Sequence, residues 1–183
     1  WREPRRVFVC SWSDFFHEAA DAWRADALDV MRRAPQHTYQ VLTKRPERFG
    51  VVRPQDWPRK LWLGVSAEDQ ATADARIPLL LDAPGKWPAA VRWVSLEPLL
   101  GPLDLSPYWR IVEAAYTLEG LAWVVAGGES GSGYRPMDLD WLASIVAQCS
   151  AADVPVFVKQ DSGIRPSRQG RIPDELYVQE FPR

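Results

Sequence analysis

The chain has 183 residues, of which 46% are hydrophobic and 25% are charged, and this composition predicts one folded domain and excludes a chain that is disordered throughout. Its formal net charge of −2 excludes a general electrostatic attraction to nucleic acid or to an anionic membrane. No apolar run approaches the ~20 residues of a membrane span, so we expect no membrane partner, and the two cysteines, Cys10 and Cys149, favour a reducing, cytoplasmic setting.

Six short, apolar, β-prone runs recur along the chain, and their first residues lie 22 to 32 residues apart. This spacing is about the length of one strand–helix unit, and neighbouring parallel strands need such a crossover. Several runs are almost continuously apolar, as expected for strands that are covered on both faces. The predicted strands are Val7–Ser11, Tyr39–Thr43, Leu61–Val65, Val91–Ser95, Ala122–Ala126 and Val154–Val158.

Stretches with apolar residues at helical spacing lie between these runs. They predict helices over Ala19–Arg33, Asp69–Leu81 and Leu139–Ala152. Because proline removes a backbone donor, we expect Pro78 to kink or shorten the second helix. A further helix is expected over Pro107–Leu118.

Alternating strands and helices predict a parallel sheet with right-handed crossovers, either an open doubly wound sheet or a barrel. The glycine-rich turn of dinucleotide-binding folds is absent after the first run, where Ser11-Trp12-Ser13-Asp14 stands instead, and this absence favours a barrel. We therefore predict an α/β fold in which residues 1–183 form a single partial, TIM-like (β/α)6 barrel domain. Residues 163–183, rich in Pro, Ser, Gly and Arg, are expected to form an extended C-terminal tail.

Polar residues follow every one of the six runs. In parallel α/β folds the C-terminal ends of the strands open onto one face, where ligands bind, so we expect these residues to surround one pocket. Lys and Glu beside strand interiors are costly unless they are paired or face a wet cavity. The candidate catalytic residues are therefore Lys44, Glu97, Glu129 and Lys159. Ordinary turn and capping roles remain open for neighbours such as Asp14 and Ser130.

The glycine-rich segment Gly127–Gly133 is the best local candidate for close approach of a ligand to the backbone, although a plain flexible turn uses the same residues. It is neither a P-loop nor a dinucleotide fingerprint. The His and Cys residues have no metal-ligand spacing, so no metal site is expected. Ten tryptophans are present; we interpret Trp12, Trp62, Trp93 and Trp123 as packing residues in or beside strands, and a base-stacking platform is the less favoured interpretation.

Several of these segments, taken in order, resemble one family. They are Ser13–His17, Ala34–Thr38, Leu42–Arg48, Leu63–Ser66, Ser95–Pro102, Gly127–Gly131 with Arg135–Met137, and Phe157–Gln160. From about Arg6 onward the chain is similar to an uncharacterised family of bacteriophages and bacteria whose members resemble radical S-adenosylmethionine (radical SAM) barrels. The resemblance implies S-adenosylmethionine and a [4Fe–4S] cluster, held by a cysteine-rich segment expected upstream of Trp1. Cys10 and Cys149 cannot supply the three or four thiolates of a cluster, so no cofactor is expected on this chain alone.

Three functions remain open on this basis. Under the first, the chain is the barrel portion of a radical SAM-like enzyme, inactive alone, with a small-molecule or nucleic-acid-derived substrate. The implied cofactor-binding residues are Ser13, Asp14, Ser66, Gly127, Gly128 and Ser130, and the implied substrate-binding residues are Thr43, Arg45, Ser95, Arg135 and Gln160. The second is a cluster-independent lyase or aldolase that uses Lys159 as a Schiff-base lysine. The third is a non-catalytic module that binds nucleic acid or a host protein.

Overall fold

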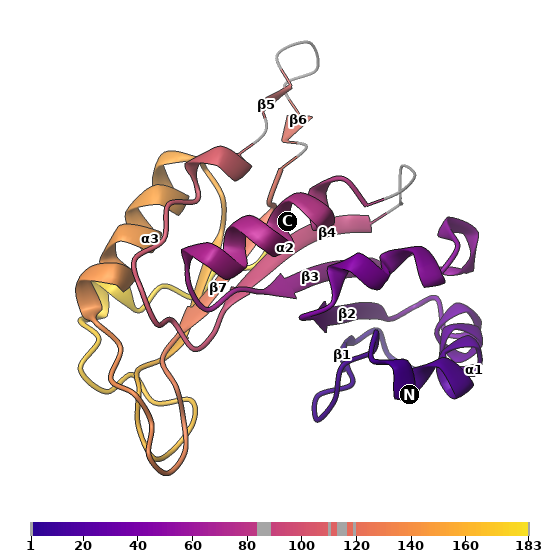
Figure 1. Ribbon diagram of the computed structural model, residues 1–183, viewed down its shortest axis with the longest axis horizontal. Coiled ribbons are helices and arrows are strands. Elements are labelled where there is room, and N and C mark those ends of the chain that lie inside the picture. Colours follow the sequence, from indigo (N-terminus) through magenta and orange to yellow (C-terminus); the bar gives the residue numbers. More distant parts are fainter. Residues whose placement is uncertain (1, 84–88, 110, 113–116, 119, 183) are drawn as a thin grey trace.

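The computed structural model describes residues 2–83, 89–109, 111–112, 117–118 and 120–182 (Figure 1). Six parallel strands form one sheet in the order β1-β2-β3-β4-β7-β8, so the strands adjoin in the order in which the chain makes them. They are β1 Arg6–Val9, β2 Thr38–Thr43, β3 Leu61–Ser66, β4 Ala89–Leu96, β7 Trp123–Gly127 and β8 Val156–Gln160. All six predicted strands are confirmed.

The sheet curls into an open half-barrel because its strand order never reverses, as it would in a doubly wound fold. Three α-helices pack on the outer face of the sheet (Figure 1): α1 Asp21–Arg33, α2 Gln70–Leu81 and α3 Leu139–Ala151. This arrangement confirms the predicted partial, TIM-like barrel. No helix in the described ranges has the length and apolar character needed to cross a membrane.

Successive side chains of each strand point alternately to the helix-covered face and to the inner face of the half-barrel, as the two-residue period of a strand requires. On β4, Val94 and Leu96 are fully buried against the helices. Trp93 and Ser95, on the same strand, face the inner side of the half-barrel. The inner side therefore receives one side chain in two from every strand.

Helix termini follow local capping chemistry. Asp69 caps α2 in a capping box with Thr72, and Asp138 caps α3 by accepting a hydrogen bond from the Asp140 N–H. The expected shortening at Pro78 is wrong: α2 continues to Leu81, and the Asp82 N–H still donates to the Pro78 carbonyl at 2.9 Å.

The predicted helix over Pro107–Leu118 is also wrong. The described residues of this stretch form a short 3-10 turn, Ser106–Tyr108, and two antiparallel strands, β5 Ile111–Val112 and β6 Thr117–Leu118. Residues 110 and 113–116 lie outside the described part of the chain. The crossover between β4 and β7 therefore carries a hairpin in place of a helix (Figure 1).

The segment after β8 returns along that strand. The Val158 N–H donates to the Val178 carbonyl at 2.7 Å, and the Glu180 N–H donates to the Val156 carbonyl at 2.9 Å. The indole N–H of Trp123 donates to the Glu180 carbonyl at 2.9 Å. These bonds bring Phe181 over the inner face of the half-barrel, 5.5 Å from Trp123 between ring centroids.

Candidate functional site

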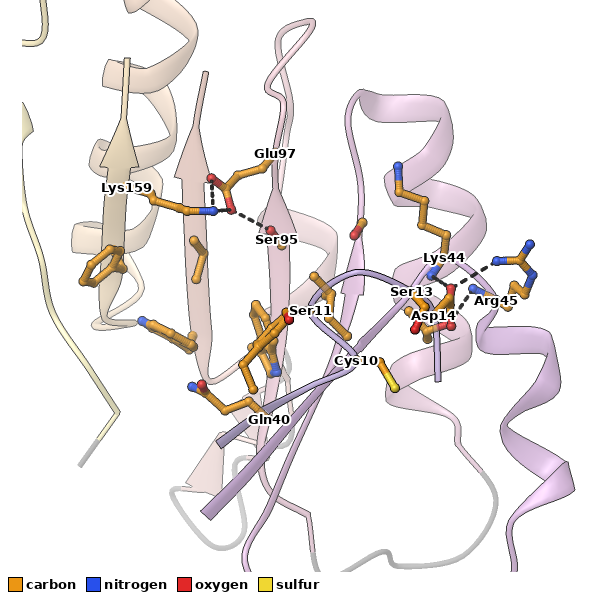
Figure 2. Close-up of a pocket in the computed structure, with 18 of the residues that line it drawn as sticks. Cys10, Ser11, Ser13, Asp14, Gln40, Lys44, Arg45, Ser95, Glu97 and Lys159 are labelled. Atoms are coloured by element: carbon orange, nitrogen blue, oxygen red, sulfur yellow. Dashed lines mark hydrogen bonds and ion pairs between the residues drawn. The ribbon is translucent and has the colours of Figure 1, made fainter. Parts of the chain in front are cut away.

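A cavity of about 550 Å³ opens on the inner face of the half-barrel (Figure 2). All six strands and the loop after β1 contribute to its lining. The predicted site residues that line it are Ser13, Asp14, Thr43, Lys44, Arg45, Ser66, Ser95, Glu97 and Lys159. The volume is within the usual range for sites that bind small organic molecules.

One side of the cavity rim carries an ion pair. The Nζ atom of Lys159 lies 3.2 Å from both carboxylate oxygens of Glu97, and the Ser95 hydroxyl donates to Oε2 of Glu97 at 3.2 Å (Figure 2). Lys159 has 47% of its side chain exposed and Glu97 has 17%. Lys159 reaches the rim because successive side chains of β8 point to opposite faces of the sheet, so that Lys159 faces inward and Gln160 faces the outer layer.

Asp14 forms the other side of the rim, where it ties the loop after β1 to the end of β2. Its Oδ1 accepts hydrogen bonds from the Thr43 hydroxyl at 2.7 Å and the Phe16 N–H at 2.8 Å. Its Oδ2 accepts from the Lys44 N–H at 3.0 Å and from Arg45 at 3.2 Å (Figure 2). Burial raises the pKa of Asp14, but these donors outweigh it and hold the pKa below its ordinary value. Asp14 is thus an ionised, fully engaged carboxylate that positions the segment carrying Lys44 and Arg45.

The Lys44 ammonium is bound by Glu68, which also accepts a hydrogen bond from Arg76 at 3.0 Å. Figure 2 shows the Lys44 side chain extending away from Asp14. Burial raises the pKa of Glu68, but Lys44 and Arg76 outweigh it and keep this pKa below its ordinary value. Lys44 therefore reaches the cavity mainly through its backbone and side-chain stem.

The base of the cavity is aromatic. Phe8, Trp93, Trp123, Phe157 and Phe181 line it, and we refer to these five residues as the aromatic floor. Trp93 and Trp123 are 3% and 5% exposed, with ring centroids 5.3 Å apart. The interpretation of Trp93 and Trp123 as packing residues is confirmed by their burial in a hydrophobic cluster, and both also line the cavity. Trp12 does not pack at all, since it is fully exposed.

The glycine-rich loop lies beside this cavity and not in its lining. Glu129 is bound by Arg135 at 2.9 Å through both of its oxygens, and the Arg135 side chain and N–H lower the pKa of Glu129 to about 2. Glu129 is not among the lining residues of this cavity, so its expected convergence with Lys44, Glu97 and Lys159 stays a prediction. Glu129 and, more weakly, Glu68 raise the pKa of Arg135, and Glu68 is the carboxylate that binds Lys44. Ser130 pairs with Gly163 in a parallel bridge.

Gln160 and Gly128 form a buried structural contact. The Gln160 amide donates to the Gly128 carbonyl at 2.9 Å and accepts from the Ser167 N–H at 2.8 Å. A side chain at Gly128 would place a Cβ atom 2.3 Å from the Ser162 nitrogen, so this position requires glycine for packing. Gly127 lies closer to the site, because a Cβ there would meet Glu97 at 3.0 Å.

The family "Protein of unknown function (DUF5131)" matches residues 1–182. The chain belongs to this family. No curated protein and no solved structure matches it. The fold and the cavity are therefore the observations from which a function can be argued.

The described residues do not supply a metal or cluster site. No group of three or more His, Cys, Asp and Glu side chains among them could hold a metal ion. Cys10 lines the cavity, whereas Cys149 is buried on α3, where burial raises its pKa to about 12. Since a [4Fe–4S] cluster needs three or four thiolates, its ligands do not come from these two cysteines.

Sequence reasoning missed several lining residues of the cavity. Gln40, Cys10 and the aromatic floor were not among the predicted site residues, and neither was Glu68, which binds Lys44. The signal that could have found most of them is the two-residue alternation within each strand. Trp93, Ser95 and Glu97 lie on one face of β4 and its continuation, as do Phe157 and Lys159 on β8.

Proposed function

We propose that this chain is the barrel portion of a radical SAM-like enzyme, and that the rim of its cavity binds the methionine part of S-adenosylmethionine. The observation that carries the proposal is the ion pair between Glu97 and Lys159 at the C-terminal ends of β4 and β8. The family resemblance of the sequence supports the choice of cofactor. The open, parallel half-barrel supports the position, because ligands of such folds bind at this end of the strands.

A zwitterionic amino acid suits this ion pair. The ligand's ammonium group would bind the Glu97 carboxylate, and its carboxylate would bind the Lys159 ammonium, so each charge exchanges one partner for another. The Ser95 hydroxyl, which donates to Glu97 at 3.2 Å, fixes the orientation of the acceptor.

Other residues take supporting roles in this proposal. Asp14 holds Arg45 and the Lys44 backbone in place, and Ser66 supplies a hydroxyl group on the adjacent strand end. The absence of a Cβ atom at Gly127 leaves room beside Glu97 for the ligand backbone. We assign no direct role to Glu129 or Arg135, which bind each other outside the cavity lining.

The cluster that would reduce S-adenosylmethionine does not fit the cysteines of the described residues. We therefore assign to this chain the binding and orientation of cofactor and substrate, and no electron transfer. The Schiff-base alternative is less favoured because the Lys159 ammonium is engaged by Glu97, whereas imine formation needs a free amine.

Calorimetry with S-adenosylmethionine and S-adenosylhomocysteine tests the proposal on this chain without any cluster. We expect both to bind, and we expect Glu97→Gln and Lys159→Met each to weaken binding about 10- to 150-fold, the usual value of a hydrogen bond to a charged group. Glu129→Gln is the matched control, since Glu129 is also a salt-bridged carboxylate near a strand end but lies outside the cavity lining. Absence of binding by the unaltered chain, or equal losses for Glu97→Gln and Glu129→Gln, would overturn the proposal.

A further inference from the structure

The aromatic floor is a cavity-lining surface with rings contributed by separate parts of the chain. Phe8 comes from β1, Trp93 from β4, Trp123 from β7, Phe157 from β8 and Phe181 from the returning segment. Phe8 and Phe181 keep 44% and 40% of their surface exposed, although both line the cavity. Large apolar side chains left open in a cavity indicate a ligand with an apolar or aromatic face.

A glycine leaves room for Trp93 at the centre of the floor. Gly64 of β3 adjoins Trp93 in the sheet, and a Cβ atom at Gly64 would lie 2.4 Å from Cε2 of Trp93. The indole therefore lies across β3 and reaches Phe8 of β1, with ring centroids 6.4 Å apart. The rings of Phe8, Trp93 and Trp123 thus adjoin one another across the half-barrel, with interplanar angles of 65° between Phe8 and Trp93 and 42° between Trp93 and Trp123.

One unpaired amide lies in this aromatic surface. Gln40 of β2 lines the cavity and is in register with Phe8 on one side and Trp62 on the other. Figure 2 shows Gln40 at the end of the cavity away from Glu97 and Lys159. Among the described residues, its side chain has no hydrogen-bond partner. An amide offers a donor and an acceptor side by side, so it matches a ligand edge with the complementary pair.

Positive charge also accompanies the floor. The Arg6 guanidinium lies 3.8 Å from the ring centroid of Phe181 and 6.0 Å from that of Trp62. Lys159 lies at the opposite end, on the rim. Because Lys159 is already paired with Glu97, an anionic group attached to the ligand's ring would find its cation in Arg6, beside Phe181.

We infer that the aromatic floor and Gln40 bind a nucleobase of the substrate. Aromatic side chains stack on the face of any base, and a glutamine amide pairs with the edge of a base through two hydrogen bonds. The inference rests on the proposed function only in assigning the base to the substrate and not to the cofactor. A purely apolar ligand, or a second copy of the chain docked by its apolar surface, would leave the Gln40 amide unpaired and desolvated.

Two sources could supply such a base: a free nucleoside or nucleotide, and an unpaired base of a single-stranded nucleic acid. Equilibrium binding of the common nucleosides, their 5′-monophosphates and short single-stranded DNA and RNA separates these sources. We expect at least one of these probes to bind by stacking on the exposed ring of Phe8 or Phe181, and to change the fluorescence of the adjoining Trp93 and Trp123. Binding by nucleosides identifies a small-molecule source, binding by oligonucleotides alone identifies a polymer, and no binding by any probe overturns the inference.

Variants locate the binding. We expect Gln40→Leu to weaken it about 5- to 150-fold and to reduce the differences between bases, since a bidentate contact contributes both affinity and selectivity. Phe8→Leu is expected to weaken it by a similar factor through the loss of stacking. The matched controls are Gln55→Leu and Trp12→Leu, which alter an exposed amide and a fully exposed indole outside the cavity lining and should change affinity less than about two-fold. Equal losses in controls and cavity variants would overturn the inference.

Competition separates this inference from the proposed function. Saturating S-adenosylhomocysteine should leave binding of the base probe unchanged, because the two ligands occupy the floor and the rim. Displacement of the probe would overturn the inference, since the floor would then hold the cofactor's own adenine. If S-adenosylhomocysteine does not bind, the proposed function fails, while Gln40→Leu and Phe8→Leu still decide whether a base binds to the floor.

Discussion

Replacement of Gly64 by alanine tests whether the aromatic floor depends on a missing side chain. The new Cβ atom would lie 2.4 Å from Cε2 and 2.6 Å from Cδ2 and Nε1 of Trp93. Ordinary carbon contacts lie at about 3.5–4.0 Å, so the indole must retreat by about 1 Å. Trp93 is 3% exposed and packs against Trp123 and Phe8, so it has little room to move.

Two opposing effects set the magnitude. Overpacking of a filled site typically costs about 1–3 kcal/mol. Alanine also restricts the unfolded chain more than glycine does, and this restriction stabilises the protein by about 0.4–1 kcal/mol. The steric effect is larger, so we expect Gly64→Ala to lower the free energy of unfolding by about 1–2 kcal/mol, or the melting temperature by about 2–8 °C.

Urea unfolding followed by tryptophan fluorescence measures this change. Gly50→Ala is the matched control, because a Cβ atom at Gly50 has no neighbour within 4 Å, and we expect its stability to be unchanged or slightly higher. Trp93→Leu should relieve the clash, so the two changes should be strongly non-additive in a double-mutant cycle. If Gly64→Ala is as stable as Gly50→Ala, or if its effect simply adds to that of Trp93→Leu, the packing argument for the floor is refuted.

Two further predictions concern a buried carboxylate and the two thiols. Asp161 is 3% exposed and accepts hydrogen bonds from the side chain and the backbone N–H of Arg171. Burial raises the pKa of Asp161, but these donors outweigh the effect of burial and keep the pKa below its ordinary value. Its stabilising effect is therefore complete above the unfolded pKa near 3.9 and is lost as the pH falls through the lower folded pKa. Urea unfolding should show that Asp161→Asn costs about 2 kcal/mol at pH 7 and progressively less as the pH is lowered below the unfolded pKa, whereas exposed Asp26→Asn should be neutral throughout. A loss that does not change with pH would contradict this reasoning. The second prediction concerns the thiols: iodoacetamide should label Cys10, which lines the cavity, and should spare Cys149, because burial raises the pKa of Cys149 to about 12. Mass spectrometry of the labelled, folded chain checks this expectation. Labelling of Cys149 in the folded chain would contradict its burial.

The sequence alone predicted the six strands and the three main helices because these depend on local signals. Runs such as Leu61–Val65 need only be apolar and bounded by polar residues, and their spacing already requires parallel crossovers. Asp69 shows the same locality at a helix start, where the cap bonds a backbone N–H three residues away. The absence of a glycine-rich turn after β1 was enough to favour a barrel over a doubly wound sheet.

The Pro107–Leu118 stretch shows where local signals fail. Its composition is compatible with a helix, yet its described residues form a turn and a two-stranded hairpin, Ile111–Val112 with Thr117–Leu118. Propensity is a weak guide when tertiary context decides between helix and strand.

Some features of the site could likewise be predicted from the sequence, and others depend on the tertiary structure. Position after a strand correctly indicated Glu97 and Lys159 as lining residues, since parallel strands end on one face. It could not show that Glu129 pairs with Arg135, because this contact depends on the path of the folded loop.

The presence of the six strands and their approximate positions were therefore determined by the sequence itself, through hydrophobic periodicity and spacing. The tertiary structure decided which face of the curled sheet stays open, and with it which side chains line a cavity. The physical reason is that a strand's period assigns its residues to two faces, while only the curvature of the whole sheet and the placement of the helices determine which face is covered.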